Sequence, residues 1–340
     1  MINSENFFLT IIIPCRNEEQ YISKCILSII NNNFKNLEII VADGCSDDKT
    51  QEIIKNLQNQ YPQIKLLINK DKTTPYGFNL GIENAKGNFI MILGAHSELR
   101  NDYIECLLNQ FINNPEADCV GGKIENVYQN NTSEIIGKAM SSVFGVGNAY
   151  FRVGSKSVWA DTVAFGTYKK NVFEKIGLFD TRLVRNQDDE FSYRMIKNGL
   201  KIYLDINLNI KYFVRSSYEN LFKQYYQYGF WKVLVNKNHK TVTTIRQLIP
   251  FIFVLSLLMS LLGAVVYNDL IFVFILILSL WLIVASSFAI KLTKNIYDWV
   301  KIIFAFFILH FSYGYGYLVG IIWFLILRNN PKEKHYKITR

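Results

Sequence analysis

The chain has 340 residues, which is enough for one or two domains with a sizeable hydrophobic core. Half of the residues are hydrophobic, and from about residue 249 to residue 327 the sequence is mostly apolar. The net charge of +9 could indicate nucleic-acid binding. The basic residues instead flank the apolar segments, which favours membrane lipids as partners and no nucleic acid (Lys223, Lys232, Lys237, Lys240, Arg246, Lys291, Lys294, Arg328, Lys332, Lys334, Lys337 and Arg340).

The cysteines argue against a disulfide framework or a zinc site. All five lie in the polar part of the chain, and none forms a C-x-x-C pair (Cys15, Cys25, Cys45, Cys106 and Cys119). A reducing cytosol fits this usage. The first ten residues lack a basic region followed by an apolar one, so we expect no signal peptide.

The first ninety residues alternate short β-rich runs with helical patterns. Hydrophobic periodicity predicts strands at Phe7–Ile13, Leu37–Ala42, Lys65–Ile68 and Phe89–Leu93, and helices at Glu18–Ile30, Asp47–Leu57 and Gly77–Asn84. Strands that alternate with helices in this way predict an α/β fold whose mostly parallel, Rossmann-like sheet is covered on both faces.

Polar clusters follow three of these predicted strands. They are Pro14 to Glu18, Asp43 to Asp47, and Gly94 to His96. In open parallel sheets, ligands bind beyond the carboxyl ends of the strands. We therefore expect the three clusters to converge on one crevice.

Two residues in these clusters have both a structural and a chemical interpretation. Asp43 could cap its own Gly-containing turn, or it could accept the imino hydrogen of a uracil or bind a ribose hydroxyl. His96 could be a structural residue at a strand end, or its neutral imidazole could ligate Mn²⁺.

Three consecutive acids begin a predicted helix that runs to Gly199. Asp188, Asp189 and Glu190 could simply complement the helix dipole, with Asn186 as the cap. Alternatively, one carboxylate could remove the proton of an acceptor hydroxyl as a new C–O bond forms. Spacing alone does not decide between these roles.

The C-terminal part predicts a membrane region. Residues 216–235 read as a helix rich in aromatics and lysines, suited either to the membrane interface or to packing against the soluble domain. Residues 247–266, 270–290 and 300–327 are each long and apolar enough to span a bilayer. We thus expect a soluble domain at 1–215, an interfacial helix and linker at 216–246, a transmembrane region at 247–327 and a basic tail at 328–340.

Two rules make different predictions for the number of spans. A hairpin of the first two spans returns Lys291 and Lys294 to the side of the soluble domain, as the positive-inside rule requires. A third span would place the basic tail on the other side, whereas a break at Ser312–Gly316 would keep it on the same side. The length of the last apolar stretch favours three spans.

The ordered set of motifs resembles family-2 glycosyltransferases of the GT-A fold, over nearly the whole chain. The motifs are I-I-I-P-C-R-N-E at 11–18, V-A-D-G-C-S-D at 41–47, G-x-N-x-G at 77–81, A-x-G at 85–87, G-A-H at 94–96, G-x-F-D at 177–180, and Q-D-D-E at 187–190 followed by Arg194. Further motifs are similar to membrane-attached glucosyltransferases of succinoglycan-type exopolysaccharide assembly: F-G-V-G-N at 144–148, D-T-V-x-F-G at 161–166, N-Q-D-D-E at 186–190 and Q-Y-x-x-Y-G-x-W at 224–231.

The resemblance assigns roles to residues at the matching positions. Those expected to bind the nucleotide donor are Pro14, Arg16, Glu18, Asp43 and Ala95. His96 falls where the metal-binding motif ends, and Asp188 falls on the position of the catalytic base, with Asp189 beside it. Gln224 and Trp231 match an acceptor-side motif, although Phe230 replaces its arginine.

The implied enzyme is an inverting hexosyltransferase on the cytoplasmic face of the cell membrane. Its donor would be a nucleotide sugar, most simply a UDP-sugar, its acceptor a lipid-linked glycan, and its cofactor Mn²⁺ or Mg²⁺. One departure stands out, because the metal-binding motif usually begins with aspartate and this chain has Gly94. That departure motivates an alternative, a non-catalytic membrane subunit of the same fold that binds nucleotide or glycan for a partner.

Overall fold

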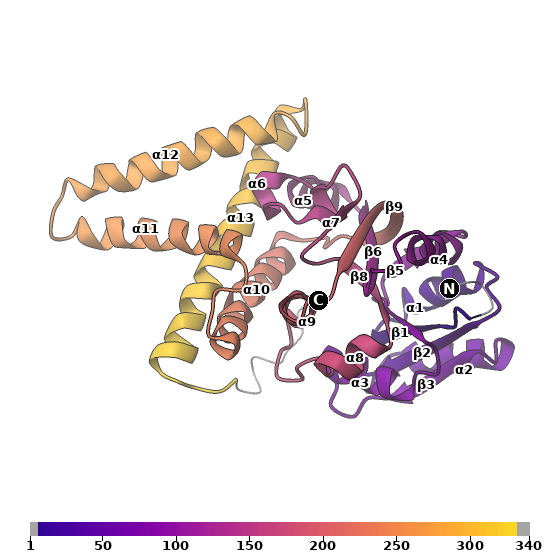
Figure 1. Cartoon of the computed structure of the whole chain (residues 1–340). Coiled ribbons are helices and arrows are strands. Elements are labelled where there is room, and N and C mark those ends of the chain that lie inside the picture. The colour runs from indigo at the N-terminus through magenta and orange to yellow at the C-terminus, as the bar shows by residue number, and fades with distance from the viewer. Residues whose placement is uncertain (1–5, 332–340) are drawn as a thin grey trace. The chain divides into compact units, whose positions relative to one another are not determined.

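The computed structural model describes residues 6–331, which form two compact units. The first unit contains residues 6–126 and Tyr150–Phe213, and the second contains Val127–Ala149 and residues 214–331. The first unit is α/β, and the second is almost entirely helical (Figure 1). Each unit is described below by itself.

The sheet of the first unit has a parallel and an antiparallel half. The parallel half runs in the order β3 (Ile64–Ile68), β2 (Leu37–Asp43), β1 (Leu9–Cys15) and β4 (Phe89–Ile92). The sheet continues through β8 (Ala164–Lys169), β6 (Cys119–Val127), β9 (Ile202–Phe213) and β5 (Ser97–Leu99), and β7 (Val158–Trp159) pairs with β9. The pairings β4–β8, β8–β6 and β9–β5 are antiparallel. The predicted α/β class and mostly parallel sheet are confirmed for the four strands that the sequence located.

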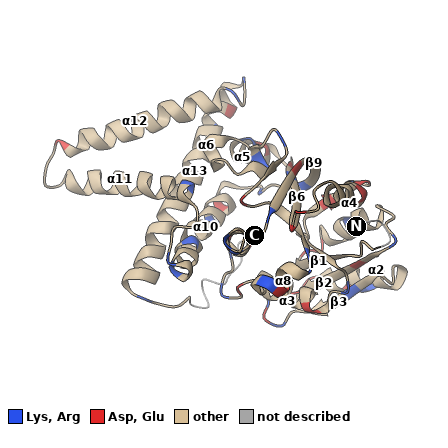
Figure 2. Cartoon of the chain, viewed as in Figure 1, with Lys and Arg blue, Asp and Glu red and all other residues tan. Residues whose placement is uncertain are grey.

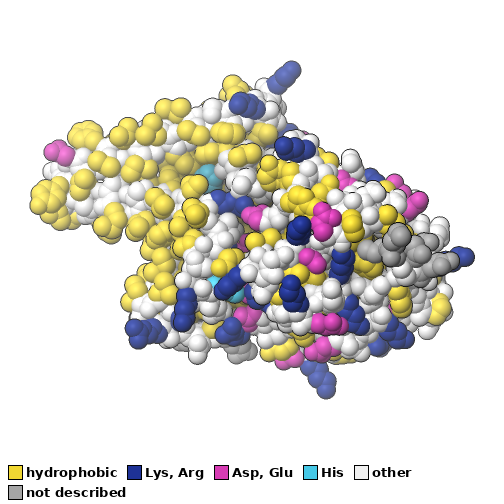
Figure 3. Space-filling model, in the orientation of Figure 1, with side chains coloured by type: hydrophobic (Ala, Val, Ile, Leu, Met, Phe, Trp, Pro, Cys, Tyr) yellow, Lys and Arg dark blue, Asp and Glu magenta, His cyan; other side chains and the backbone are white. Residues whose placement is uncertain are grey.

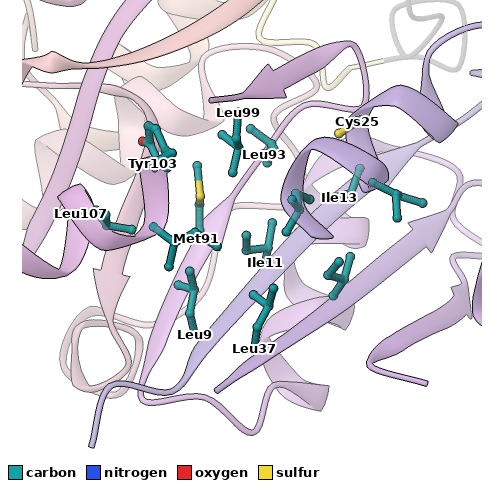
Figure 4. Packing of buried hydrophobic residues seen from close by; sticks show 14 of the residues in the cluster. Leu9, Ile11, Ile13, Cys25, Leu37, Met91, Leu93, Leu99, Tyr103 and Leu107 are labelled. Atoms are coloured by element: carbon teal, nitrogen blue, oxygen red, sulfur yellow. The ribbon is translucent and has the colours of Figure 1, made fainter. Parts of the chain in front are cut away.

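Helices cover both faces of this sheet. On one face lie α1 (Ile22–Ile30), α2 (Thr50–Gln60) and α4 (Tyr103–Asn113), and on the other lie α3 (Thr74–Asn84), α8 (Asn171–Ile176) and α9 (Gln187–Lys197). Because side chains alternate along a strand, Leu9, Ile11 and Ile13 of β1 enter the first core, which Figure 4 shows, and Ile12 enters the second. The remaining helix of this unit is the single turn α7 (Tyr150–Val153).

Two helices begin later than predicted. The first begins at Ile22 instead of Glu18, and the second begins at Thr50 instead of Asp47. In both cases the polar residues before the helix hydrogen-bond to another loop, so they are not available to extend the helix. The Asp48 carboxylate accepts the first backbone N–H of α2, at 2.9 Å from the Thr50 nitrogen.

The second unit combines an internal segment with the C-terminal helices. The internal segment forms α5 (Asn131–Met140) and α6 (Val143–Val146), which the sequence analysis did not single out. The C-terminal part forms α10 (Tyr218–His239), a 3₁₀ turn η1 (Ile245–Leu248), α11 (Ile249–Gly263), α12 (Leu270–Ala289), α13 (Ile296–Gly320) and a π-helical segment η2 (Ile321–Ile326).

Three helices of the second unit are long and apolar enough to cross a membrane. They are Ile245–Gly263, Leu270–Ala289 and Ile296–Ile326. Neither α11 nor α12 carries a charged residue (Figure 2), and hydrophobic side chains dominate the surface over these helices (Figure 3). The third helix continues through Ser312–Gly316 without a break, which supports three candidate spans. The predicted basic tail lies outside the described residues from residue 332 onward.

Close packing of α10 on α13 depends on glycines in both helices. A Cβ atom on Gly229 of α10 would lie 2.0 Å from the Tyr313 carbonyl oxygen. A Cβ on Gly316 of α13 would lie 2.1 Å from the Tyr226 carbonyl oxygen. The helices therefore meet backbone to backbone, as the G-x-x-x-G spacing of Gly316 and Gly320 in α13 allows.

Candidate active site

The loops that follow β1 and β2 are joined by hydrogen bonds. The Asn17 backbone nitrogen donates to Ser46 Oγ at 2.8 Å, and the Asn17 side-chain oxygen accepts from the Asp47 nitrogen at 3.0 Å. The Glu18 nitrogen donates to Thr50 Oγ1 at 2.7 Å. Asn17 adopts a left-handed backbone with φ of 57°, a conformation that asparagine tolerates better than most residues. Two of the three predicted polar clusters therefore form one structure.

Glu18 and His96 connect the third cluster to the first. Glu18 is buried, and one of its carboxylate oxygens lies 3.6 Å from His96 Nδ1. Ala95 is also buried, so a direct role in donor binding falls to its backbone. The imidazole of His96 packs against the ring of Tyr212 at a centroid distance of 5.3 Å. The predicted convergence of the three strand ends is confirmed.

The Asp43 carboxylate is buried and engaged by its own loop. Its oxygens accept hydrogen bonds from the Ser46 backbone nitrogen at 3.0 Å, the Ser46 hydroxyl, and Gln51 Nε2 at 2.6 Å. This is the turn-capping role that the sequence left open. A nucleoside that uses this carboxylate has to displace at least the Gln51 amide.

Pro14 and Arg16 flank the same strand end. Pro14 is partly buried and pairs in register with Ala42 of β2. Gly77 packs close behind it, since a Cβ on Gly77 would lie 3.2 Å from Pro14 Cβ. Arg16 is exposed beside the Gly44 turn, where its guanidinium is accessible to an anionic ligand.

The acidic cluster opens α9, and its members have different environments. Glu190 is buried and forms a two-point ion pair with Arg194, with contacts of 2.8 and 3.0 Å. Arg194 also donates to the carbonyl oxygens of Ile176 and Leu178. Glu190 is thereby held as a structural residue, and the catalytic alternatives narrow to Asp188 and Asp189.

Asp188 is an exposed residue, and the acidity of its carboxyl is altered. Its Oδ1 accepts the Asp189 backbone N–H at 2.9 Å, and no cation of the described chain lies within ion-pair distance. Although the residue keeps an exposed surface, desolvation by surrounding protein atoms and then the Asp189 charge raise the pKa of the Asp188 carboxyl above its usual value. Such a shift makes a carboxylate a better proton acceptor at neutral pH.

Few protein ligands are available for a metal ion. Within residues 6–331, no group of three or more His, Cys, Asp or Glu side chains is arranged to hold one. Gly94 contributes no donor, which leaves His96 and its neighbour Glu18. These two donors suit a cation only if the substrate supplies the remaining ligands.

The predicted acceptor-side residues lie inside the second unit. Gln224 is buried and donates to the Tyr228 hydroxyl at 2.9 Å. Trp231 has no exposed surface and packs against Phe230 and Phe324. Their role toward an acceptor remains a prediction.

Sequence reasoning missed three residues around His96. Tyr212, Phe165 and Arg152 are neighbours of the third cluster or of one another. Phe165 belongs to the quoted D-T-V-x-F-G motif, so a signal for it was present. Arg152 follows the F-G-V-G-N motif by four residues, but nothing in the sequence around it indicates that it lies beside a strand end.

Comparison with known proteins identifies the family. The family model described as "Glycosyl transferase family 2" matches residues 10–177. A Methanococcus voltae protein named dolichyl N-acetyl-alpha-D-glucosaminyl phosphate 3-beta-D-2,3-diacetamido-2,3-dideoxy-beta-D-glucuronosyltransferase is 34% identical over 93% of this chain and 97% of its own length. The chain therefore belongs to glycosyltransferase family 2 and is a glycosyltransferase.

Two further similarities agree with this assignment. The succinoglycan biosynthesis protein ExoA of Rhizobium meliloti (strain 1021) is 26% identical over 71% of this chain and 73% of its own length. The crystal structure of GalNAc-T7 with UDP, GalNAc and Mn²⁺ shares the fold with a TM-score of 0.50 at 14% identity, covering 63% of this chain and 45% of that one. The expected GT-A fold is confirmed.

Proposed function

We propose that this glycosyltransferase moves a hexose from a UDP-sugar to a lipid-linked glycan, with inversion at the anomeric carbon. Two relatives support this substrate class, since one is named as acting on a dolichyl phosphate sugar and the other as a succinoglycan biosynthesis protein. The pathway that best fits both is assembly of a surface polysaccharide or another lipid-linked glycan.

The observation that supports the catalytic role is the Asp188 carboxyl at the start of α9, which forms no ion pair within residues 6–331 and has a raised pKa. Its neighbour Glu190 is instead held in an ion pair with Arg194. Burial and then the Asp189 charge raise the pKa of Asp188, although the nearby Arg185 charge acts in the opposite direction. We assign Asp188 as the base. An acceptor oxygen forms a bond to the anomeric carbon, its proton passes to Asp188, and the sugar–phosphate bond breaks with its electron pair left on the nucleoside diphosphate.

The joined loops after β1, β2 and β4 form the donor site in this proposal. Asp43 would bind the uracil or ribose after displacing the Gln51 amide, and the exposed Arg16 would lie near the phosphates. A divalent cation, Mn²⁺ or Mg²⁺, would be held by His96 and Glu18, and when bound it would neutralise diphosphate charge.

The membrane region would keep the enzyme near a lipid-bound acceptor. We place the catalytic chemistry in residues 1–215 on the cytoplasmic face of the cell membrane, because nucleotide sugars are made in the cytosol. The spans between residues 247 and 327 would anchor it, and Gln224 and Trp231 would shape the acceptor side.

A transfer assay tests the proposal. The purified full chain is incubated with a panel of nucleotide sugars and a lipid extract of its native membranes, and the products are identified by mass spectrometry. We expect one donor to be consumed with extension of a lipid-linked glycan. Nucleotide binding without turnover of any donor would instead support the alternative of a non-catalytic subunit, which the glycine at position 94 suggested.

The membrane topology needs a separate measurement. With the five native cysteines removed, a single cysteine replaces the exposed Asn330 just after the third helix. Three spans predict that an impermeant thiol reagent labels it in intact cells. Labelling only after permeabilisation would place residue 330 on the cytoplasmic side and contradict three spans.

A further inference from the structure

The space beside Gly94 is filled by an aromatic ring. A Cβ atom on Gly94 would lie 3.2 Å from Cε1 of Phe165 and 3.4 Å from Ser97 Oγ. Phe165 itself has a φ of 52°, an uncommon conformation for a bulky residue, so the surrounding structure has to hold it there. The resembled motif usually has an aspartate at position 94. In this chain the atoms nearest to that position belong to Phe165 and Ser97, and neither residue is acidic.

A guanidinium lies close to the same region. Arg152 of α7 is partly buried, and its Cζ lies 5.7 Å from the ring centroid of Tyr212, a distance typical of a cation–π contact. Its Nη1 atom is buried and has no hydrogen-bond partner within residues 6–331. None of the ion pairs of this part of the chain involves Arg152.

A buried charged donor without a partner has an energetic cost that a ligand can remove. Withdrawing a guanidinium N–H from water without a hydrogen bond is unfavourable, and the penalty is larger for charged groups than for neutral ones. An anion that meets this donor recovers the lost interaction. A phosphate or carboxylate group can do this with two parallel hydrogen bonds, and the donor loops next to this site make a phosphate the relevant ligand.

Tyr212 places this guanidinium next to the donor loops. The Tyr212 ring contacts both Arg152 and His96, and the His96 imidazole lies 3.6 Å from Glu18. Strand pairing places the Tyr212 backbone next to the third cluster, since Tyr212 of β9 is in register with Ser97 of β5. All four residues belong to the first unit, so the chain of contacts is internal to it.

We propose that Arg152 binds the diphosphate of the donor and neutralises the charge that grows on it as the sugar leaves. This rests on the proposed nucleotide-sugar function. The permanent positive charge of Arg152 compensates for the acidic metal ligand missing at Gly94, so diphosphate binding depends only weakly on a divalent cation. Tyr212 acts as a positioning residue, because it holds the guanidinium without touching the donor.

Calorimetry on the full chain in detergent tests this inference. UDP and uridine are titrated into wild-type protein and Arg152→Gln, each with Mn²⁺ and with a chelator. In chelator we expect Arg152→Gln to bind UDP about 10- to 100-fold more weakly, equal to about 1.4–2.8 kcal/mol. Uridine, which lacks phosphates, should bind both proteins equally, and Arg152→Lys should recover part of the UDP affinity.

Arg182→Gln is the matched control, because Arg182 is an exposed arginine of the same unit that pairs with Asp180 at 2.7 Å. It should leave UDP binding unchanged. Equal UDP affinity in Arg152→Gln and wild type would overturn the inference, and so would a parallel loss of UDP and uridine, which indicates a merely structural arginine. If the wild type binds neither compound, the proposed donor class fails, and the inference fails with it.

Discussion

The two units hold their parts together with different kinds of contact. In the first unit, side-chain hydrogen bonds such as Asn17–Ser46 and Glu18–Thr50 join the loops at the ends of β1 and β2, and His96 after β4 lies 3.6 Å from Glu18. In the second unit, α10 and α13 meet at backbone distance through Gly229 and Gly316. The hydrogen-bonded loops leave polar groups available at the edge of the sheet. The contact between α10 and α13 leaves no room for any side chain.

This difference predicts how each unit responds to substitution. A polar residue at the edge of the first unit can lose its function while the sheet and its two cores remain intact. At a helix contact formed by backbone atoms, a substitution affects stability directly, because an added methyl group has to push the helices apart. The predictions below test this contrast, beginning with the largest expected effect.

Asp188→Asn should abolish transfer and leave the fold unchanged. The amide cannot accept the acceptor proton at neutral pH, and removal of a catalytic base costs several factors of ten in rate, each about 1.4 kcal/mol in the barrier. Steady-state transfer and UDP titration measure the two effects, and donor affinity should stay near the wild-type value. Asp189→Asn is the control. If it loses the rate while Asp188→Asn keeps most of it, the base is Asp189.

Gly229→Ala should destabilise the second unit more than Gly81→Ala destabilises the first. A Cβ on Gly229 would lie 2.0 Å from a backbone oxygen, whereas a Cβ on Gly81 would lie 2.4 Å from Cγ2 of Ile12, a side chain that can shift. Overpacking typically costs about 1–3 kcal/mol, and a backbone contact should reach the upper end. Thermal unfolding of the full chain in detergent compares the two variants. A larger loss for Gly81→Ala would contradict the contrast between the units.

The sequence was most informative where polar candidate site residues directly follow a strand. Residues 14–18, 43–47 and 94–96 were located correctly because a buried β-rich run followed by polar residues is a strong local signal. The antiparallel strands β6, β8 and β9 were not located, since their pairing is between residues far apart in the chain. For the same reason Arg152 was missed, because its neighbour Tyr212 is sixty residues away.

In the second unit, composition predicted the apolar helices but not their contacts. Three long apolar stretches were evident, and the structure has three helices that could cross a membrane. The association of α5 and α6 with α13 could not be read from the sequence. It depends on contacts such as that of His310 Nε2 with the Phe144 carbonyl oxygen at 2.7 Å. Hydrophobic patterns show which segments leave water, but they do not show which segments become neighbours.

Asp43→Ala should weaken UDP binding by about 1–3 kcal/mol, the usual effect of leaving a donor group of the ligand unpaired. Gln51→Ala is the matched control, because it removes an amide that occupies the Asp43 carboxylate at 2.6 Å and leaves the carboxylate itself in place. We expect Gln51→Ala to bind UDP at least as well as wild type. Calorimetry with UDP measures both variants, and unchanged affinity in Asp43→Ala would remove this residue from the donor site.

The pH dependence of transfer offers the finest test of the α9 cluster, because its expected effect is a shift and not a loss. A base has to be deprotonated, so activity should fall as the pH drops through the pKa of Asp188, which burial and then the Asp189 charge raise. Asp189→Asn removes one of these two causes and keeps the side chain's size. The acidic limb of the profile for kcat should therefore move to lower pH, while activity above the limb stays near that of wild type. Arg182→Gln, a charge change elsewhere in the same unit, should leave the limb in place. A limb that moves to higher pH in Asp189→Asn, or does not move at all, would show that the titrating group is not Asp188.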